Sequence, residues 1–133
     1  EWHIVGEGSQ RTKIEKSIQE NNAGDYIFLE GEQKNPYRYI KNADYLFVPS
    51  LHEAAPMVFD EAASLGVPII STDTLSAYEL VAERKIGYVG SIEKLTSLVK
   101  KALSNQSETK KIMEKYRANN DEARADFECL CND

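Results

Sequence analysis

The amino-acid sequence predicts an α/β protein with a doubly wound, Rossmann-like parallel sheet. Short apolar segments of strand length alternate with helical segments from Trp2 to Val89. Such alternation is typical of parallel strands joined by right-handed helical crossovers. A chain of 133 residues with 41% hydrophobic residues also fits one domain. Ligands of these sheets bind at the carboxyl ends of the strands, so functional residues are expected there.

Five segments are predicted to be strands because they are short, apolar and rich in β-branched or aromatic residues. They are residues 2–5, 26–29, 45–48, 68–71 and 87–89. Helices are predicted after them, at residues 10–21, 36–41, 57–65, 77–82 and 92–103, with a last one at residues 108–126. In the first helix Ile14 and Ile18 lie four residues apart and form an apolar stripe.

Local signals mark the limits of two of these helices. Gly66, followed by Pro68, predicts the end of the helix that starts at residue 57. Ser76 and Glu79 form a capping-box pattern, so the next helix is expected to run from Ala77 with Ser76 as its cap. This interpretation makes Glu79 a structural residue.

The charge balance limits the classes of partner. The chain has 22 acidic and 16 basic residues and a net charge of −6, which disfavours nucleic acid or an anionic membrane as the main partner. No apolar run approaches ~20 residues, so no transmembrane segment is expected. Cys129 and Cys131 lack further ligands for zinc and are predicted to be reduced thiols, in agreement with a cytoplasmic location. Because the chain opens on Glu1 within a predicted strand, it is interpreted as a piece of a longer protein.

The stretch from Pro49 to Gly66 carries the strongest functional signal. It leaves the third predicted strand, crosses a loop that contains Glu53, and enters a helix at Pro56. Glu61 follows in that helix, with seven residues between the two glutamates. The free N–H groups and partial positive charge of such a helix N-terminus suit a phosphate. Carboxylates beside it can accept hydrogen bonds from sugar hydroxyls, and phosphate with hydroxyls is the chemistry of a sugar nucleotide.

This pattern resembles the signature of the retaining glycosyltransferases of family 4. The matching residues are Pro49, Ser50, Glu53, Pro56, Glu61, Ala62, Gly66, Pro68 and Ile69. Segments 4–8, 28–31 and 42–50 are also similar, so the resemblance extends from about Trp2 to Val89. Members of this family have the GT-B fold, with two Rossmann-like domains and the active site between them. The resemblance implies that residues 1–133 are a C-terminal, nucleotide-sugar-binding domain, one half of such an enzyme.

The resemblance also implies roles for individual residues. Glu53 would be the catalytic residue of this piece, holding hydroxyls of the donor sugar. Glu61 would bind the ribose hydroxyls of the nucleotide. The backbone N–H groups of Met57 and Val58 would meet the diphosphate.

The loop between the two glutamates departs in part from the family. Many relatives have Gly-Phe-Gly after the first glutamate, where this chain has Ala54, Ala55 and Pro56. Proline is found at the third position in other relatives, whereas Ala54 in place of glycine narrows the freedom of the backbone. Ala55 and Pro56 are still expected to line the donor.

Three glycines at other strand ends are further candidates for donor binding. Gly6 and Gly8 follow the first strand and precede a helix, and in relatives this loop lines the donor cleft. Arg11 stands where a dinucleotide fingerprint has its third glycine, so a nicotinamide or flavin dinucleotide is not expected. Gly31 ends the second strand, where relatives hold the base. His52 is interpreted as an incidental loop histidine.

The function implied by the resemblance is hexosyl transfer with retention from a nucleoside diphosphate sugar, with a UDP-sugar as the expected donor, to a glycan or lipid-linked acceptor. No metal or cofactor is implied, because backbone amides and basic side chains serve the diphosphate in this family. The family's Arg and Lys, its first domain strand and its acceptor-binding N-terminal domain would lie outside this chain. The piece alone is therefore expected to be inactive. The full-length enzyme would work in the cytoplasm or at the membrane surface.

Two other classes of protein remain open. A non-catalytic nucleotide-sugar-binding module would share both glutamates but lack the Arg and Lys in the full gene. A flavodoxin-like or receiver-type signalling domain has a similar length. A receiver needs an aspartate after its third strand, where this chain has Val48, Pro49 and Ser50, so the sequence disfavours it.

Overall fold

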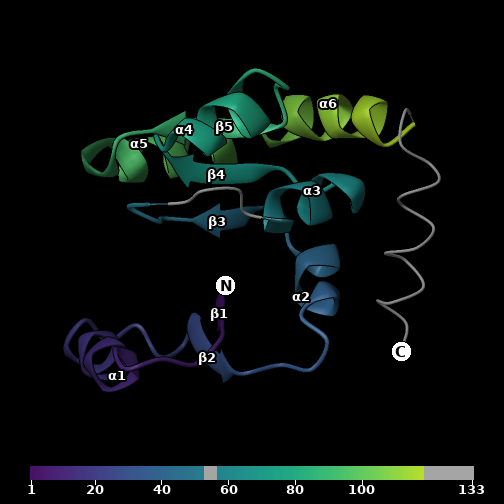
Figure 1. Cartoon of the computed structure of the whole chain (residues 1–133). Helices are drawn as coiled ribbons and strands as arrows, with labels where there is room; N and C mark the ends of the chain where they lie inside the picture. The colour runs from purple at the N-terminus through teal and green to yellow at the C-terminus, as the bar shows by residue number, and fades with distance from the viewer. Residues whose placement is uncertain (53–56, 119–133) are drawn as a thin grey trace.

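A computed structural model describes residues 1–52 and 57–118, in which strands and helices alternate (Figure 1). The strands are β1 (Trp2–Val5), β2 (Ile27–Gly31), β3 (Leu46–Val48), β4 (Ile69–Thr72) and β5 (Gly87–Gly90). The α-helices are α1 (Arg11–Glu20), α2 (Tyr37–Asn42), α3 (Met57–Ser64), α4 (Leu75–Ala77), α5 (Leu95–Ser104) and α6 (Gln106–Ala118). The α/β class is confirmed, and each predicted strand is present within two residues of its expected bounds.

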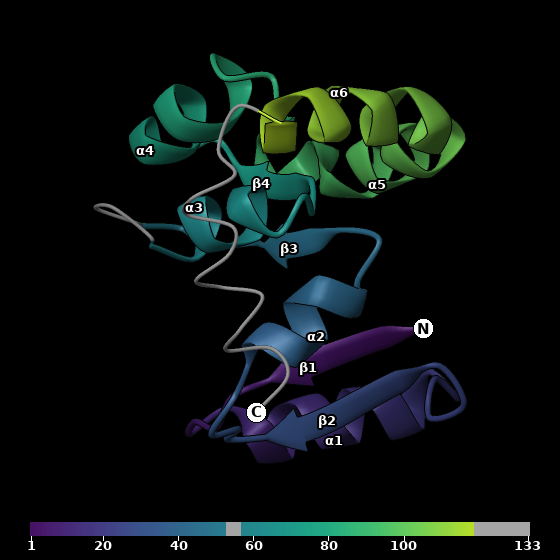
Figure 2. The ribbon, with the colours of Figure 1, turned by 90° about the vertical axis from the view of Figure 1, so that its right-hand side faces the viewer.

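The parallel sheet is in two parts, whereas the sequence predicts one. β1 pairs with β2, and β3, β4 and β5 form a second sheet in that order, with every pairing parallel. In Figure 2, β1, β2 and β3 all run from right to left, so the two half-sheets share one strand direction. At the division the rings of Trp2 on β1 and Phe47 on β3 meet edge to face, with centroids 5.0 Å apart. β1 and β3 therefore face each other through side chains and not through a hydrogen-bond ladder.

One face of both half-sheets is covered by α1 and α5. Trp2 and Ile4 of β1 line a hollow together with Ile14 of α1, which places α1 over this face. On the other half-sheet, the hydroxyl of Tyr45 donates a 2.7 Å hydrogen bond to the carbonyl of Ala102 in α5. Phe47 lies two residues after Tyr45 and shares its face, because side chains alternate along a strand.

The opposite face is covered by α2, α3 and α4. The ring of His3 in β1 lies 6.2 Å from that of Tyr39 in α2. Leu46 and Val48 of β3 pack against the buried core, to which α3 contributes Phe59. The helix after β1 and the helix after β3 thus lie on opposite faces, which is the doubly wound arrangement.

The core lies between α3 and the strands of the second half-sheet. Phe59, Ile69 and Val81 are fully enclosed there, and every residue of β4 is buried. The first half-sheet is much more open, since α1 has no buried residue and β1 is largely exposed. Gly87 is required where β5 meets β4, because a Cβ at this position would lie 2.0 Å from the carbonyl oxygen of Ile69.

The predicted end of α3 is confirmed. Gly66 has a φ of 75°, a conformation that glycine adopts without strain. Its N–H bonds the carbonyl of Ala63, and the N–H of Val67 bonds that of Ala62, which is the hydrogen-bond pattern of a Schellman cap. The chain then turns directly into β4.

The predicted cap of α4 is wrong. The helix begins two residues earlier, and Thr74 is its N-cap, with the threonine hydroxyl accepting a 3.2 Å hydrogen bond from the N–H of Ala77. Thr74 is extended (φ −74°, ψ 156°), whereas Ser76 is already inside the helix and buried. α4 continues as a π-helix, Tyr78–Ala82, which holds Glu79 in its first turn with an exposed side chain. The capping box therefore does not explain Glu79.

The C-terminal helices begin close to their predicted positions. A 3-10 turn, Ile92–Lys94, leads into α5. α6 starts at Gln106, two residues before the expected start, and is described to Ala118. The remainder of the predicted helix, and both cysteines, lie outside the described residues.

Candidate functional site

The carboxyl ends of β1, β2 and β3 lie on one side of the molecule, because the three strands run in the same direction (Figure 2). The connections that leave these strands hold two sets of predicted site residues, Gly6 and Gly8 after β1 and Gly31 at the end of β2. His52, interpreted as incidental, follows β3. α3 follows β3 and begins at Met57. The predicted site residues that the structure describes thus belong to the side where ligands of parallel sheets bind.

The first turn of α3 supplies the candidate phosphate-binding groups. Met57 and Val58 are its first two residues, and the first four N–H groups of an α-helix have no partner within the helix. The Met57 side chain is 76% exposed. Asp60, also in this turn, is paired with Arg84 at 2.7 Å, so its negative charge is compensated. The partial positive charge of a helix N-terminus favours an anion at such a position.

Three predicted residues cannot be placed. Glu53, Ala55 and Pro56 lie outside the described residues, in the stretch between His52 and Met57. Their assigned roles therefore stay predictions.

Glu61 lies one turn into α3 and is held by a residue that sequence reasoning did not select. The hydroxyl of Tyr37 in α2 donates a 3.3 Å hydrogen bond to Glu61 Oε1. The Tyr37 ring packs against the buried core, which fixes the position of that hydroxyl. A carboxylate offers about four acceptor positions on its two oxygens, so a bond from Tyr37 leaves capacity for a pair of ligand hydroxyls. The only signal for Tyr37 in the sequence is its place directly after Pro36, at a helix start.

Two hydroxyl groups of β4 donate hydrogen bonds to the chain at the end of β3. The Ser71 hydroxyl donates a 3.0 Å hydrogen bond to the carbonyl of Val48. The Thr72 hydroxyl donates another to the carbonyl of Ser50. These two hydrogen bonds attach Val48 and Ser50 to β4 where the chain leaves the sheet.

The turn after β1, which contains Gly6 and Gly8, is hydrogen-bonded to the end of β2 and holds a pair of charged residues. Gly6 (φ 133°) donates a 2.8 Å hydrogen bond to the carbonyl of Gly31 (φ 69°). A Cβ on Gly31 would lie 2.9 Å from the Glu7 carboxylate, which pairs with Arg11. A Cβ on Gly8 would meet no other atom within 4 Å. Glu7 and Asp60 are thus each paired with an arginine, one in the turn after β1 and the other in the first turn of α3.

A small polar hollow adjoins the carboxyl ends of β3, β4 and β5. It has a volume of about 150 Å³ and is lined by Ser50, Leu51, Thr72, Asp73, Thr74, Ser91, Ile92 and Glu93. A hydrogen bond from Ser91 lowers the pKa of the Glu93 carboxyl. The hollow is smaller than the roughly 300–1,000 Å³ of most ligand pockets, so it could accept only part of a ligand.

The described contacts assemble the predicted residues into two groups. Met57, Val58 and Glu61 come together on α3, while Gly6, Gly8 and Gly31 come together on the first half-sheet. Within residues 1–52 and 57–118, no group of three His, Cys, Asp or Glu side chains lies close enough to hold a metal ion. No helix in the same part of the chain is long and apolar enough to cross a membrane.

The architecture is that of solved glycosyltransferases with the GT-B fold. The structure superposes on WaaG, a glycosyltransferase involved in lipopolysaccharide biosynthesis, with a TM-score of 0.76 and 24% identity, over 90% of this chain and 33% of that one. It superposes on TarM with a TM-score of 0.78 and 23% identity, over 98% of this chain and 28% of that one. These likenesses establish the fold.

Residues 1–120 match the family model of the glycosyl transferases group 1, and the chain belongs to this family. It is 37% identical over 70 residues to an uncharacterized glycosyltransferase of Methanocaldococcus jannaschii, covering 53% of this chain and 17% of that protein. It is 35% identical over 82 residues to the lipopolysaccharide 1,6-galactosyltransferase of Salmonella typhimurium, covering 57% of this chain and 23% of that protein. The chain thus spans about a fifth of the length of these relatives.

Proposed function

We propose that this chain is the donor-binding part of a retaining glycosyltransferase that takes a nucleoside diphosphate sugar. The observation that carries the proposal is the position of Glu61, one turn into α3 and hydrogen-bonded to Tyr37. The Glu61 carboxylate offers acceptors for ribose hydroxyls, and the N–H groups in the first turn of α3 offer donors for a diphosphate. Family membership supports the same reading.

The transferred group is a hexosyl unit, and the donor we favour is a UDP-sugar. The Salmonella relative is named a galactosyltransferase, and a Campylobacter jejuni relative, 26% identical over 115 residues, is named an N-acetylgalactosaminyltransferase acting on a diphospho-undecaprenol-linked sugar. These names support a glycan or lipid-linked acceptor, bound by another part of the full-length protein in the cytoplasm or at the membrane surface.

In the proposed reaction the bond between the anomeric carbon and the diphosphate oxygen breaks, and a bond from the same carbon to the acceptor oxygen forms. The nucleoside diphosphate leaves with the bonding electron pair, and the proton of the acceptor hydroxyl passes to the leaving diphosphate oxygen. Met57 and Val58 stabilise the leaving group through their N–H groups, as donors aimed at developing negative charge do. Glu61 anchors the ribose, and Glu53 contacts the sugar that reacts.

Calorimetric titration of the chain with UDP, GDP, ADP and TDP tests the donor-binding role. We expect one of them to bind, and Glu61→Ala to weaken that binding by about 1–3 kcal/mol because charge-assisted hydrogen bonds to the ribose are lost. Glu61→Gln should lose less, since one acceptor oxygen remains. Glu114→Ala, on the exposed side of α6, is the matched control and should bind like the wild type. Equal affinity of wild type and Glu61→Ala would contradict the assignment of Glu61.

A further inference from the structure

We propose that the polar hollow at the carboxyl ends of β3, β4 and β5 binds one neutral sugar ring of the acceptor glycan. The inference rests on the proposed function, which supplies such an acceptor, and it adds a contact between the acceptor and this part of the protein. The hollow is lined by none of the residues assigned to the nucleotide or the diphosphate.

The polar groups of the hollow are rich in hydrogen-bond acceptors. The Thr72 hydroxyl donates its proton to the carbonyl of Ser50, and the Ser91 hydroxyl donates to the Glu93 carboxylate. A hydroxyl has one proton and two lone pairs, so an oxygen that has donated can still accept. Asp73 adds a second carboxylate. The lining therefore suits a ligand that brings several O–H donors, as a sugar ring does.

The charges of the lining disfavour an anion. Asp73 and Glu93 are both acidic, and no basic residue belongs to the described lining. The lowered pKa of Glu93, caused first by the hydrogen bond from Ser91, agrees with an ionised carboxylate. A phosphate would be repelled here, whereas a neutral sugar can donate charge-assisted hydrogen bonds to both carboxylates. Within residues 1–52 and 57–118, no third acidic or histidine side chain joins the two to hold a metal ion.

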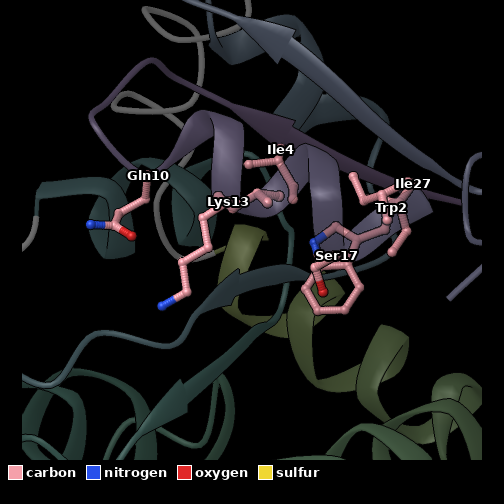
Figure 3. A pocket seen from close by; sticks show the side chains of 8 residues that line it. Trp2, Ile4, Gln10, Lys13, Ser17 and Ile27 are labelled. Carbon is pink, nitrogen blue, oxygen red and sulfur yellow. The ribbon is translucent and has the colours of Figure 1, made fainter. Parts of the chain in front are cut away.

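Two exposed apolar side chains border these polar groups. Leu51 is 68% exposed and Ile92 is 50% exposed, and both line the hollow. The C–H groups of a sugar ring form an apolar face, which such side chains can cover. The hollow of about 400 Å³ beside α1 differs, because its described lining is mainly apolar, with Trp2 and Ile4 among its residues, and includes no carboxylate (Figure 3).

Hydrogen bonds connect the three strand ends that form the hollow. Thr72 of β4 pairs with Gly90 of β5, and Ser91 follows Gly90 directly. Ser71 and Thr72 donate to the end of β3. Binding groups placed on connected strands are positioned before the ligand arrives. The volume of about 150 Å³ is below that of most ligand pockets, so it fits one ring of a longer chain.

NMR titration of the isotope-labelled full-length protein tests the proposal. The probes are methyl α-glucoside, methyl α-galactoside and methyl N-acetyl-α-galactosaminide. We expect at least one of them to shift the amide signals of Leu51, Asp73 and Ile92 in a saturable manner, with a Kd in the millimolar range. The shifts should persist when UDP-galactose is present, because an acceptor subsite stays open beside a bound donor.

Two substitutions test the carboxylates. Asp73→Asn and Glu93→Gln should each raise the Kd of the glycoside about threefold or more, because a charge-assisted hydrogen bond becomes a neutral one. Asp25→Asn, at an exposed residue before β2 and so at the opposite end of the strands, is the matched control and should change nothing. The affinity for nucleoside diphosphates should stay the same in all three variants.

The absence of saturable shifts at these amides with every probe would overturn the proposal, as would a Kd that neither Asp73→Asn nor Glu93→Gln changes. Shifts caused by magnesium chloride or methylammonium chloride but not by the glycosides would make the hollow a cation site. Loss of the shifts in the presence of UDP-galactose would mean that the donor sugar occupies the hollow, and the assignment to the acceptor would be wrong. Failure of the proposed function is distinguished from these results, because it appears as equal nucleoside diphosphate affinity of wild type and Glu61→Ala.

Discussion

Tyr37 and Glu61 are joined by a hydrogen bond of 3.3 Å from the phenol hydroxyl to Oε1, which connects α2 to α3 across 24 positions of the chain. The tyrosine ring is half-buried and packs against the core, so the bond favours one position of the carboxylate before a ligand arrives. A binding group held in this way loses less conformational entropy when it binds. We therefore expect Tyr37 and Glu61 to contribute to ligand binding together.

We expect Tyr37→Phe to weaken nucleoside diphosphate binding by about 0.5–1.5 kcal/mol, because Glu61 loses its positioning bond. The free energy of unfolding should change little, since the ring stays in place. Calorimetry and denaturant unfolding measure the two effects. Tyr26→Phe, at a tyrosine that is 52% exposed, is the matched control and should change neither. Unchanged binding by Tyr37→Phe, beside weakened binding by Glu61→Ala, would show that Glu61 acts without Tyr37.

The stability of the first half-sheet should depend on pH through Glu30. Its pKa is lowered, chiefly by the hydrogen bond with His3 Nδ1 at 2.6 Å and also by the hydroxyl of Tyr39. Because the pKa of Glu30 is lower in the folded state, this stabilisation is fully present above the unfolded value of about 4.3 and is lost as the pH falls through the folded pKa.

We therefore expect Glu30→Gln to melt below the wild type at pH 6, and the difference in Tm to shrink when the pH drops below about 4. Thermal melts followed by circular dichroism, from pH 6 to below pH 4, would measure this difference in Tm. Glu114→Gln serves as the exposed control and should keep a constant, small difference. A difference for Glu30→Gln that does not change with pH would mean that the carboxylate charge contributes nothing.

Gly87→Ala should destabilise the pairing of β4 with β5. The added Cβ would stand 2.0 Å from the carbonyl oxygen of Ile69, which is backbone and cannot rotate away. We expect a loss of about 1–3 kcal/mol in the free energy of unfolding, measured in urea. Gly24→Ala, where a Cβ meets nothing within 4 Å, should stay within about 0.5 kcal/mol of the wild type. Similar effects of the two substitutions would contradict the close approach of the strands.

In the full-length protein, Glu53→Ala should lower kcat more than it raises KM for the donor. A contact with the reacting sugar is worth most in the transition state, so its loss appears mainly in turnover. Steady-state kinetics measure both constants, and NMR of the product should show retained anomeric configuration. A raised KM with unchanged kcat would make Glu53 a donor anchor. Turnover by the 133-residue chain alone would contradict the proposed division of the enzyme.

The sequence by itself was sufficient for the order of strands and helices and for several of their ends. Apolar segments such as residues 69–72 have strand length and composition, and the Gly66 signal depends only on local backbone geometry. The motif around Glu61 likewise lies in one continuous stretch. These features are readable because the residues that produce them are neighbours in the chain.

The tertiary structure decided the features that join distant residues. Tyr37 could not be chosen from sequence, because its value depends on how α2 packs on α3 and on where the core holds its ring. Ser76 had the sequence of a cap, yet Thr74 took that role, since the chain turns extended at Thr74 as it leaves β4. The local sequence also does not show that β1 and β3 belong to separate sheets. Whether two parallel strands pair depends on backbone hydrogen bonds between residues that are far apart in sequence.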